Sequence, residues 1–292
     1  MVERVRSMLV RFMPGLKSLL SRGPAGWMVF IGVLIVFSVM LMTLLGPWIA
    51  PYDPFTPSVG PLLSPPSSEF PFGTTRLGQD MLSRVLTGGS VMLQVAFLSA
   101  LFCFAVGVPI GLFASYVGGK IDKSFSIVMD SIYAFPGLVL AIAIAAMLGR
   151  GVISMALAIA VVYIPSYFRI VRSQVLTIKE LPYIAAAKAT GARWYTILFV
   201  HILPNVIPSI VVVVTVNFAD AILTAAGLTF VGLGVEVDVP DWGWDLTRGR
   251  QDLPSGAWWV ITFPGLMIIL LALGFTLIGE GLNELTSPKL RK

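Results

Sequence analysis

Residues 27–50 read WMVFIGVLIVFSVMLMTLLGPWIA, an apolar run without a single charged side chain. A helix needs about 20 apolar residues to cross the hydrocarbon core of a bilayer, so this run is long enough to span it. It is also longer than the apolar part of a secretory signal peptide, which favours an uncleaved helix. Five further stretches are predominantly apolar, at residues 91–117, 126–148, 151–168, 204–230 and 257–279. Together they predict an all-α membrane protein with six transmembrane helices.

The composition excludes several other classes of protein. Of the 292 residues, 57% are hydrophobic and only 12% are charged, whereas soluble domains have about 25% charged residues. So much apolar content also excludes disorder, and one cysteine excludes a disulfide scaffold. The chain has one histidine and one cysteine, so it offers few side chains for a metal site or for a nucleophile with its base. It also lacks the phosphate-binding loop G-x-x-x-x-G-K-[ST]. We therefore expect no enzyme, and no cofactor in this chain.

The basic residues predict the orientation of the helices. With the amino terminus inside, the inner segments hold fifteen Lys and Arg residues and the outer segments five, which agrees with the positive-inside rule. The net charge of +5 is then explained without nucleic acid. We therefore expect a multi-pass cell-membrane protein with both termini in the cytoplasm. Its expected segments are a cytoplasmic amino-terminal segment 1–26, a first transmembrane helix 27–50 and an extracytoplasmic segment 51–90. They are followed by a five-helix core 91–280, which contains a cytoplasmic loop 169–203, and by a cytoplasmic tail 281–292.

The loop 169–203 carries the most information. Pro182 can begin a helix, because proline suits the first helical position. Gly191 can end that helix, because glycine readily adopts the left-handed conformation common just after the last helical residue. Between them lies the alanine-rich stretch 183–190. A helix this short is marginal in water, and its small side chains allow a close approach. These properties indicate a helix that is stabilised in the cleft of another protein.

This loop resembles a known motif. Residues 184–191, Ile-Ala-Ala-Ala-Lys-Ala-Thr-Gly, followed by His201-Ile-Leu-Pro204, are similar to the EAA motif, E-A-A-x(3)-G-x(9)-I-x-L-P, of ABC importer permeases. Ala185 stands where glutamate is usual and His201 where the first isoleucine is usual. The departure at Ala185 removes a carboxylate. We therefore expect the contact between this loop and its partner protein to depend on shape rather than on an ion pair.

Two other regions resemble the C-type permease of the dipeptide and oligopeptide importers. Residues 72–84, FGTTRLGQDMLSR, are similar to F-G-T-D-x-L-G-R-D-x-x-S-R, apart from Thr75 and Gln79. Residues 228–234, LTFVGLG, and 240–243, PDWG, are similar to L-S-F-L-G-L-G and P-x-W-G of the same subfamily. The resemblance covers roughly residues 25–292 and implies a type I ABC importer permease fold, with one helix before a five-helix core.

The resemblance also implies partners. Such a permease pairs in membrane lipid with a homologous B-type permease, two cytoplasmic ATPases that bind ATP and Mg, and an extracytoplasmic substrate-binding protein. It would form half of a translocation pathway for peptides or related solutes, and bind no nucleic acid. The residues expected to couple it to an ATPase are Pro182, Ala185, Ala186, Ala187, Gly191, Ala192, Leu203 and Pro204.

Two carboxylates fall within the predicted spans, where a charge should face protein or water. For Asp130, which is shallow, we favour a structural role. Asp220 is deeper, and with Asn217 and Thr224 it has the i, i+3, i+7 spacing of one helix face. That face fits either the lining of a translocation path or hydrogen bonds between helices.

Small residues recur every four positions at Gly107, Gly111, Ser115 and Gly119. They allow another helix to approach closely, either within this chain or from the partner permease. Farther along, Trp242 and Trp244 fit either an interfacial aromatic belt or a docking surface for an external protein.

Other functions remain open at this point. The same family includes carriers of oligosaccharides and of metal complexes, and the sequence does not select among these substrates. A stand-alone secondary transporter would be expected to show an internal repeat and several deep carboxylates, and a membrane-embedded enzyme a nucleophile with a base or a set of metal ligands. We find none of these patterns.

Overall fold

The computed structural model describes residues 21, 23–235 and 239–286. Residues 1–20 of the predicted amino-terminal segment and residues 287–292 of the predicted tail therefore lie outside the described residues. The described part is built from helices, which confirms the predicted all-α class. They are α3 (Pro24–Ile49), α4 (Met81–Thr87), α5 (Gly89–Val117), α6 (Gly119–Tyr133), α7 (Gly137–Leu148), α8 (Val152–Ile178), α9 (Pro182–Ala189), α10 (Trp194–Thr196), the π-helix η1 (Ile197–Ile202), α11 (Leu203–Phe230), α12 (Trp242–Asp252), the 3₁₀ helix η2 (Leu253–Ser255) and α13 (Trp259–Thr286).

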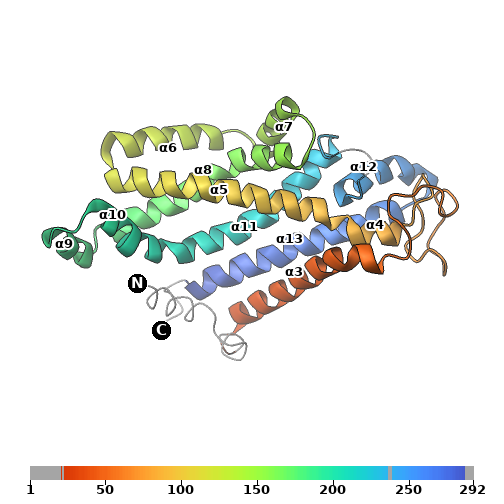
Figure 1. The fold of residues 1–292 in the computed structure, drawn as a ribbon, viewed down its shortest axis with the longest axis horizontal. Coiled ribbons are helices and arrows are strands. Elements are labelled where there is room, and N and C mark those ends of the chain that lie inside the picture. Colours follow the sequence, from red (N-terminus) through yellow and green to blue (C-terminus); the bar gives the residue numbers. More distant parts are fainter. Residues whose placement is uncertain (1–20, 22, 236–238, 287–292) are drawn as a thin grey trace.

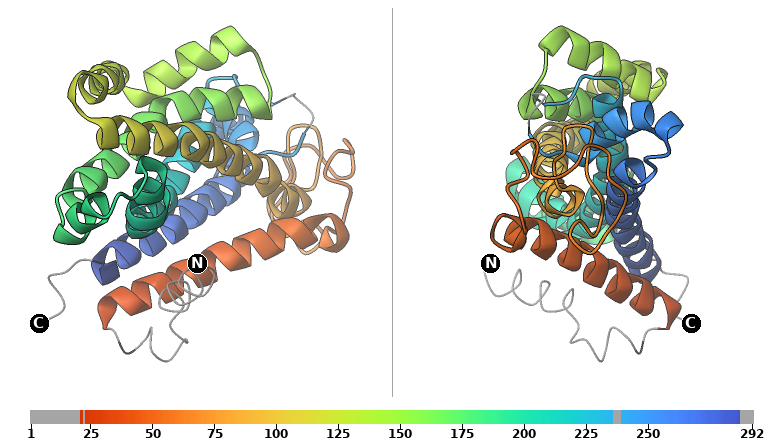
Figure 2. Two further views of the ribbon diagram at one scale, coloured as in Figure 1. Left: turned by 60° about the vertical axis from the view of Figure 1, so that its left-hand side comes forward. Right: turned by 90° about the vertical axis from the view of Figure 1, so that its right-hand side faces the viewer.

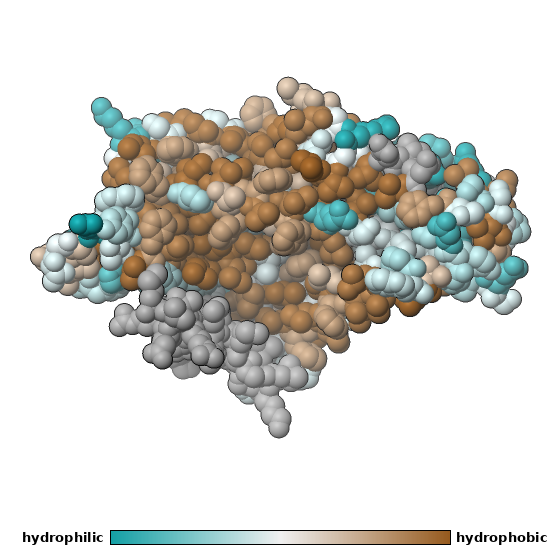
Figure 3. All heavy atoms as spheres, in the orientation of Figure 1, coloured by the Kyte–Doolittle hydropathy of each residue, from teal (hydrophilic) through white to brown (hydrophobic). Residues whose placement is uncertain are grey.

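The long helices lie side by side along the long axis of the molecule (Figures 1 and 2). In the described residues, five helical segments are long and apolar enough to cross a membrane: 24–49, 81–117, 152–178, 194–230 and 259–286. On the face that Figure 3 shows, hydrophobic residues form a broad band across the middle, with more hydrophilic residues toward both ends. This band is the surface expected of a protein surrounded by lipid.

The third predicted span differs from the expectation of one helix over 126–148. The structure has two helices there, α6 and α7, which meet at an angle of 90°. The break lies at Ala134–Pro136, where Pro136 becomes the residue that precedes α7. Proline has no backbone N–H to continue the ladder and disfavours a helical residue before it, so it separates the two helices.

Two ion pairs hold α6 against α8. Arg172 binds Asp122 in a bidentate manner, with both N···O distances at 2.7 Å. Arg169 donates to Asp130 at 2.7 Å and also lies over the ring of Tyr133. Asp130 therefore lies at a helix–helix contact, as its predicted structural role requires, and its side chain stays exposed.

The small residues of α5 lie against α8. A β-carbon at Gly107 would lie 2.8 Å from the β-carbon of Tyr167, and one at Gly111 would lie 2.9 Å from that of Val171. Ser115 is fully buried on the same face. Gly119 does not belong to this stripe, because α5 ends at Val117 and Gly119 begins α6. The close approach therefore occurs within the chain.

A second close approach attaches the first helix to the core, and the sequence patterns above did not reveal it. A β-carbon at Gly32 of α3 would lie 2.6 Å from the carbonyl oxygen of Gly274 on α13. At Gly281, a β-carbon would lie 2.9 Å from the carbonyl oxygen of Ala25. Glycine thus allows these two backbones to touch, so α3 packs tightly on α13.

Candidate functional site

The predicted loop helix exists and protrudes from one end of the bundle (Figure 1). It is α9, an eight-residue helix with Pro182 at its start. Ile184 is its one buried side chain, and it packs into the apolar cluster that contains Leu198 and Ile202. The Tyr183 hydroxyl also accepts a hydrogen bond from Asn205 of α11, at 3.3 Å. A short helix with these few contacts has little stabilisation of its own, and most of its surface is available to another protein.

A Schellman motif ends α9. Gly191 has φ +80°, its N–H donates to the carbonyl of Lys188 at 3.0 Å, and the N–H of Ala192 donates to the carbonyl of Ala187 at 3.0 Å. These are the 5→2 and 6→1 bonds of that motif. They turn the chain sharply toward α10, and the positive φ requires glycine because a β-carbon would strain the backbone.

The expected coupling residues divide into two groups by exposure. Ala185, Ala186 and Gly191 are exposed, together with Pro182, whereas Ala187, Ala192, Leu203 and Pro204 are half-buried. Large side chains near the exposed group in the sequence are exposed as well: Leu181, Tyr183, Trp194 and Tyr195 each expose about two fifths to one half of their surface. The exposed coupling residues are therefore accessible to another protein, whereas the half-buried ones are partly covered by this chain.

The polar face predicted on α11 lies partly against α8. Asn217 and Thr224 are buried and Asp220 is half-buried. The hydroxyl of Thr224 is 3.0 Å from that of Tyr163 on α8, so part of this face does serve helix packing. No hydrogen bond or ion pair of Asp220 is found within the described part of the chain, so the packing interpretation does not account for Asp220.

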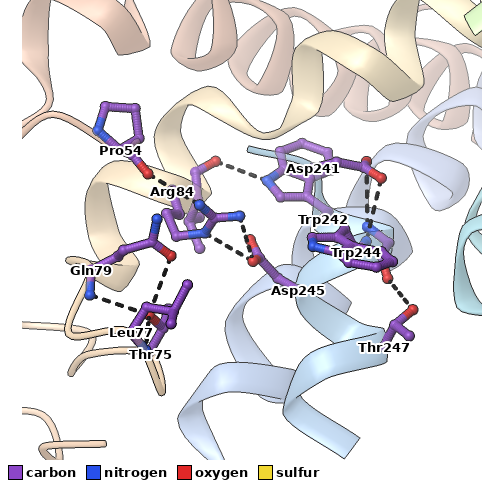
Figure 4. Close-up of polar contacts among 12 residues, drawn as sticks. Pro54, Thr75, Leu77, Gln79, Arg84, Asp241, Trp242, Trp244, Asp245 and Thr247 are labelled. Atoms are coloured by element: carbon purple, nitrogen blue, oxygen red, sulfur yellow. Dashed lines mark hydrogen bonds and ion pairs between the residues drawn. The ribbon is translucent and has the colours of Figure 1, made fainter. Parts of the chain in front are cut away.

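At the end of the bundle opposite α9, residues 51–88 and 239–258 pack together into a structure that we call the cap (Figure 1). An ion pair joins its two halves: Arg84 and Asp245 are 1% and 2% exposed, with Nε donating to Oδ1 at 2.9 Å. Arg84 also donates to the carbonyl of Pro54 at 3.1 Å. Figure 4 shows these contacts. The segments 72–84 and 240–243, which carry the family resemblance, thus meet in one place.

Both interpretations of Trp242 were wrong. Its side chain is fully buried in the cap, where Nε1 donates to the carbonyl of Val85 at 2.9 Å, so it neither lines a membrane surface nor faces a partner. Trp244 is half-buried beneath the guanidinium of Arg248. Trp259 makes an equivalent bond to the carbonyl of Thr74 at 3.0 Å. One indole N–H, of Trp242, therefore joins the two halves of the cap, and a second, of Trp259, attaches residues 51–88 to the start of α13.

The cap contains an acid with an unusual pKa. Asp241 precedes α12 and accepts from the backbone N–H groups of Gly243 and Trp244, at 3.4 and 3.3 Å. Burial, and after it the negative charge of Asp245, raise the pKa of Asp241 to about 7. Between an unfolded pKa of about 3.9 and this value, the folded chain holds a proton that the unfolded chain has lost.

We therefore expect the cap to become more stable as the pH falls from 8 toward 5.5. The slope should reach at most about 1.4 kcal/mol per pH unit, and Asp241→Asn should flatten it while keeping a good helix cap. Thermal unfolding followed by tryptophan fluorescence measures both. The control is Asp53→Asn, because hydrogen bonds from Phe55 and Thr56 lower the pKa of exposed Asp53, so that it titrates below this range of pH. A parent midpoint that does not change with pH would contradict the prediction.

Sequence reasoning missed the residues that depend on long-range contacts. Arg84 lies in a motif that the sequence revealed, but the sequence did not reveal its partner Asp245. Tyr163 had no predicted role, because its contact with Thr224 depends on how α8 packs against α11. Within the described residues, no group of three or more His, Cys, Asp or Glu side chains could hold a metal ion.

Comparisons with known proteins agree with this arrangement. Residues 107–292 match the family described as the binding-protein-dependent transport system inner membrane component. The chain is 38% identical over 266 residues to a di/tripeptide transport system permease protein of Pseudomonas aeruginosa, covering 89% of this chain and 88% of that protein. It is 40% identical over 226 residues to a glutathione transport system permease protein of Pectobacterium atrosepticum, covering 77% and 75%.

A solved structure has the same fold. An inward-facing MetNI methionine ABC transporter matches with a TM-score of 0.53 and 21% sequence identity, covering 70% of this chain and 95% of the matched chain. At this identity the likeness concerns the fold alone. It supports the helical arrangement described above, including the expected similarity to an importer permease core.

Proposed function

Because this chain belongs to the family of binding-protein-dependent transport system inner membrane components, we propose that it forms one half of a pathway that carries peptides across the membrane. The chain is a multi-pass membrane protein and a permease subunit of an ABC importer, in agreement with the resemblance found in the sequence. Peptides are the proposed class of solute because relatives are peptide or glutathione permeases. Oligosaccharides and metal complexes are the alternatives.

The observation that carries the mechanism is the position of α9. An exposed helix with Ile184 as its one buried side chain, followed closely in the chain by exposed aromatic side chains, is suited to a groove on a cytoplasmic ATPase. Two such ATPases would hold ATP and Mg, and their closure would push on α9. Moving a two-state permease from 1:99 to 99:1 needs about 5.5 kcal/mol of differential binding, which ATP-driven closure can supply.

The orientation that we propose places α9 and both termini in the cytoplasm. It is supported by the fifteen-to-five distribution of Lys and Arg. The start of α3 and the end of α13 also lie toward the α9 end of the bundle (Figure 1). The cap would then lie outside, where a substrate-binding protein delivers the solute. A homologous permease would cover the open side of α11.

Purification and transport test this proposal. We expect the chain to purify with a second permease and two ATPases, and to import radiolabelled dialanine into proteoliposomes only with ATP inside and the binding protein outside. Maltotriose serves as the control solute. Uptake by this chain alone would instead support a secondary transporter, and import of maltotriose without dialanine would contradict the peptide assignment.

A further inference from the structure

Asp220 lies on the open side of α11. Val216, Asp220 and Leu223 are spaced i, i+4 and i+7, so they share one helix face, and the side chains of Val216 and Leu223 are 37% and 52% exposed. Asp220 is ten residues from the outer end of the helix at Phe230, or about 15 Å at 1.5 Å per residue. This depth corresponds to the middle of a bilayer, where a carboxylate toward lipid would cost several kcal/mol. The face must therefore meet water or protein.

The groups around Asp220 are hydrogen-bond acceptors or can become so. The Thr224 hydroxyl, one turn along the helix, is paired with the Tyr163 hydroxyl at 3.0 Å, and the Tyr163 hydroxyl interacts electrostatically with Asp220. A hydroxyl that donates one bond still has lone pairs to accept others. Asn217, three residues before Asp220, is buried beside Tyr167 of α8. One negative charge and two hydroxyl oxygens thus gather beside an open face.

We propose that Asp220, with the hydroxyls of Thr224 and Tyr163, forms a transient binding site for a primary ammonium group, such as the amino terminus of a passing peptide. This inference rests on the proposed transport function. An ammonium is compact and has three N–H donors pointing in different directions, which suits one carboxylate and two hydroxyls. A guanidinium from the partner permease would instead bind both oxygens of the Asp220 carboxylate in one plane and would leave the two hydroxyls unused.

The same arrangement permits release. Only one of the three acceptors is charged, and the two hydroxyls can return to each other when the ammonium leaves. Conduction requires a site that is favourable enough to enter and weak enough to leave. The site would therefore select solutes by charge during passage, separately from the selection made by a binding protein.

Cysteine reactivity tests this site without relying on transport. In the complete complex, with Cys103→Ala as background, Leu223→Cys places a thiol three residues from Asp220. Its reaction rates with 2-aminoethyl and 2-sulfonatoethyl methanethiosulfonate, each divided by the rate with a free thiol, are compared. We expect the ammonium reagent to be favoured at least about tenfold, because one nearby negative charge attracts it and repels the sulfonate.

The matched variants separate the outcomes. Asp220→Asn should reduce the preference to near unity, and Asp220→Glu, which keeps the charge, should retain most of it. Equal rates for both reagents in the parent would overturn the ammonium site while leaving the pathway intact. A thiol that neither reagent reaches would overturn the pathway at this face as well. Loss of the partner permease on purifying Asp220→Asn would show that Asp220 pairs with that protein instead.

Discussion

Gly191→Val should weaken ATPase binding and uncouple ATP hydrolysis from the solute. Gly191 closes the Schellman motif of α9 at φ +80°, and a left-handed backbone costs a residue with a β-carbon about 1–2 kcal/mol. Because α9 has one buried anchor, Ile184, it has little stability with which to absorb that cost. We expect binding to fall about five- to thirtyfold, since 1.4 kcal/mol corresponds to tenfold.

The chain contains a matched control at the other end of the bundle. Gly232 has φ +90° and ends α11 with the same two bonds, from its own N–H to Thr229 and from the N–H of Leu233 to Leu228, at 2.8 and 2.9 Å. Gly232→Val therefore imposes the same backbone strain far from α9. It should leave ATPase binding in detergent unchanged, which separates a local effect from a general loss of stability.

Ala186→Trp tests the same contact without altering the backbone. Ala186 is exposed, so the isolated chain should tolerate a larger side chain, whereas a close-packed groove should not. Overpacking typically costs about 1–3 kcal/mol. ATPase binding and substrate-stimulated hydrolysis are measured for both variants. If Gly191→Val and Ala186→Trp both bind and hydrolyse like the parent, α9 does not couple this permease to its ATPases.

The second large effect is expected in the cap. Arg84→Met leaves Asp245, which is 2% exposed, as an unpaired buried charge, and breaking a buried ion pair in this way costs about 3–5 kcal/mol. Denaturant unfolding of the purified chain measures the change. The control is Arg169→Met, because the Arg169–Asp130 pair is exposed, at 44% and 62%, and such pairs contribute about 0–1 kcal/mol.

A double variant distinguishes the ion pair from its surroundings. Replacing both partners, as Arg84→Met with Asp245→Leu, removes the uncompensated charge and should recover much of the loss, as buried ion pairs often can be replaced by apolar side chains. The interaction free energy follows from the double-mutant cycle. An Arg84→Met variant within 1 kcal/mol of the parent would contradict a structural role for this pair.

The break between α6 and α7 shows how far local patterns extend. Pro136 is visible in the sequence as a residue that disfavours a helix before it, but many membrane helices continue through a proline because neighbouring groups satisfy the freed carbonyls. Whether the helix bends by 90° or continues depends on what surrounds it. Here Arg169 and Arg172 of α8 bind α6 through ion pairs. Ala141 and Ala145 of α7 pack instead into the apolar cluster that contains Ile159 of α8, so each of the two helices makes its own contact with α8.

The sequence by itself determined the membrane class, the extent of most long helices and the bounds of the loop helix near Pro182 and Gly191. Each of these depends on free energies that act within a few residues, namely transfer from water, capping and backbone strain. The tertiary structure alone decided that Arg84 meets Asp245, that Trp242 is buried, and that Asp220 lacks a partner in the described chain. These properties depend on which distant segments of the chain come together. Only that packing buries a charge or an indole N–H, and burial then changes its contribution to the free energy of folding.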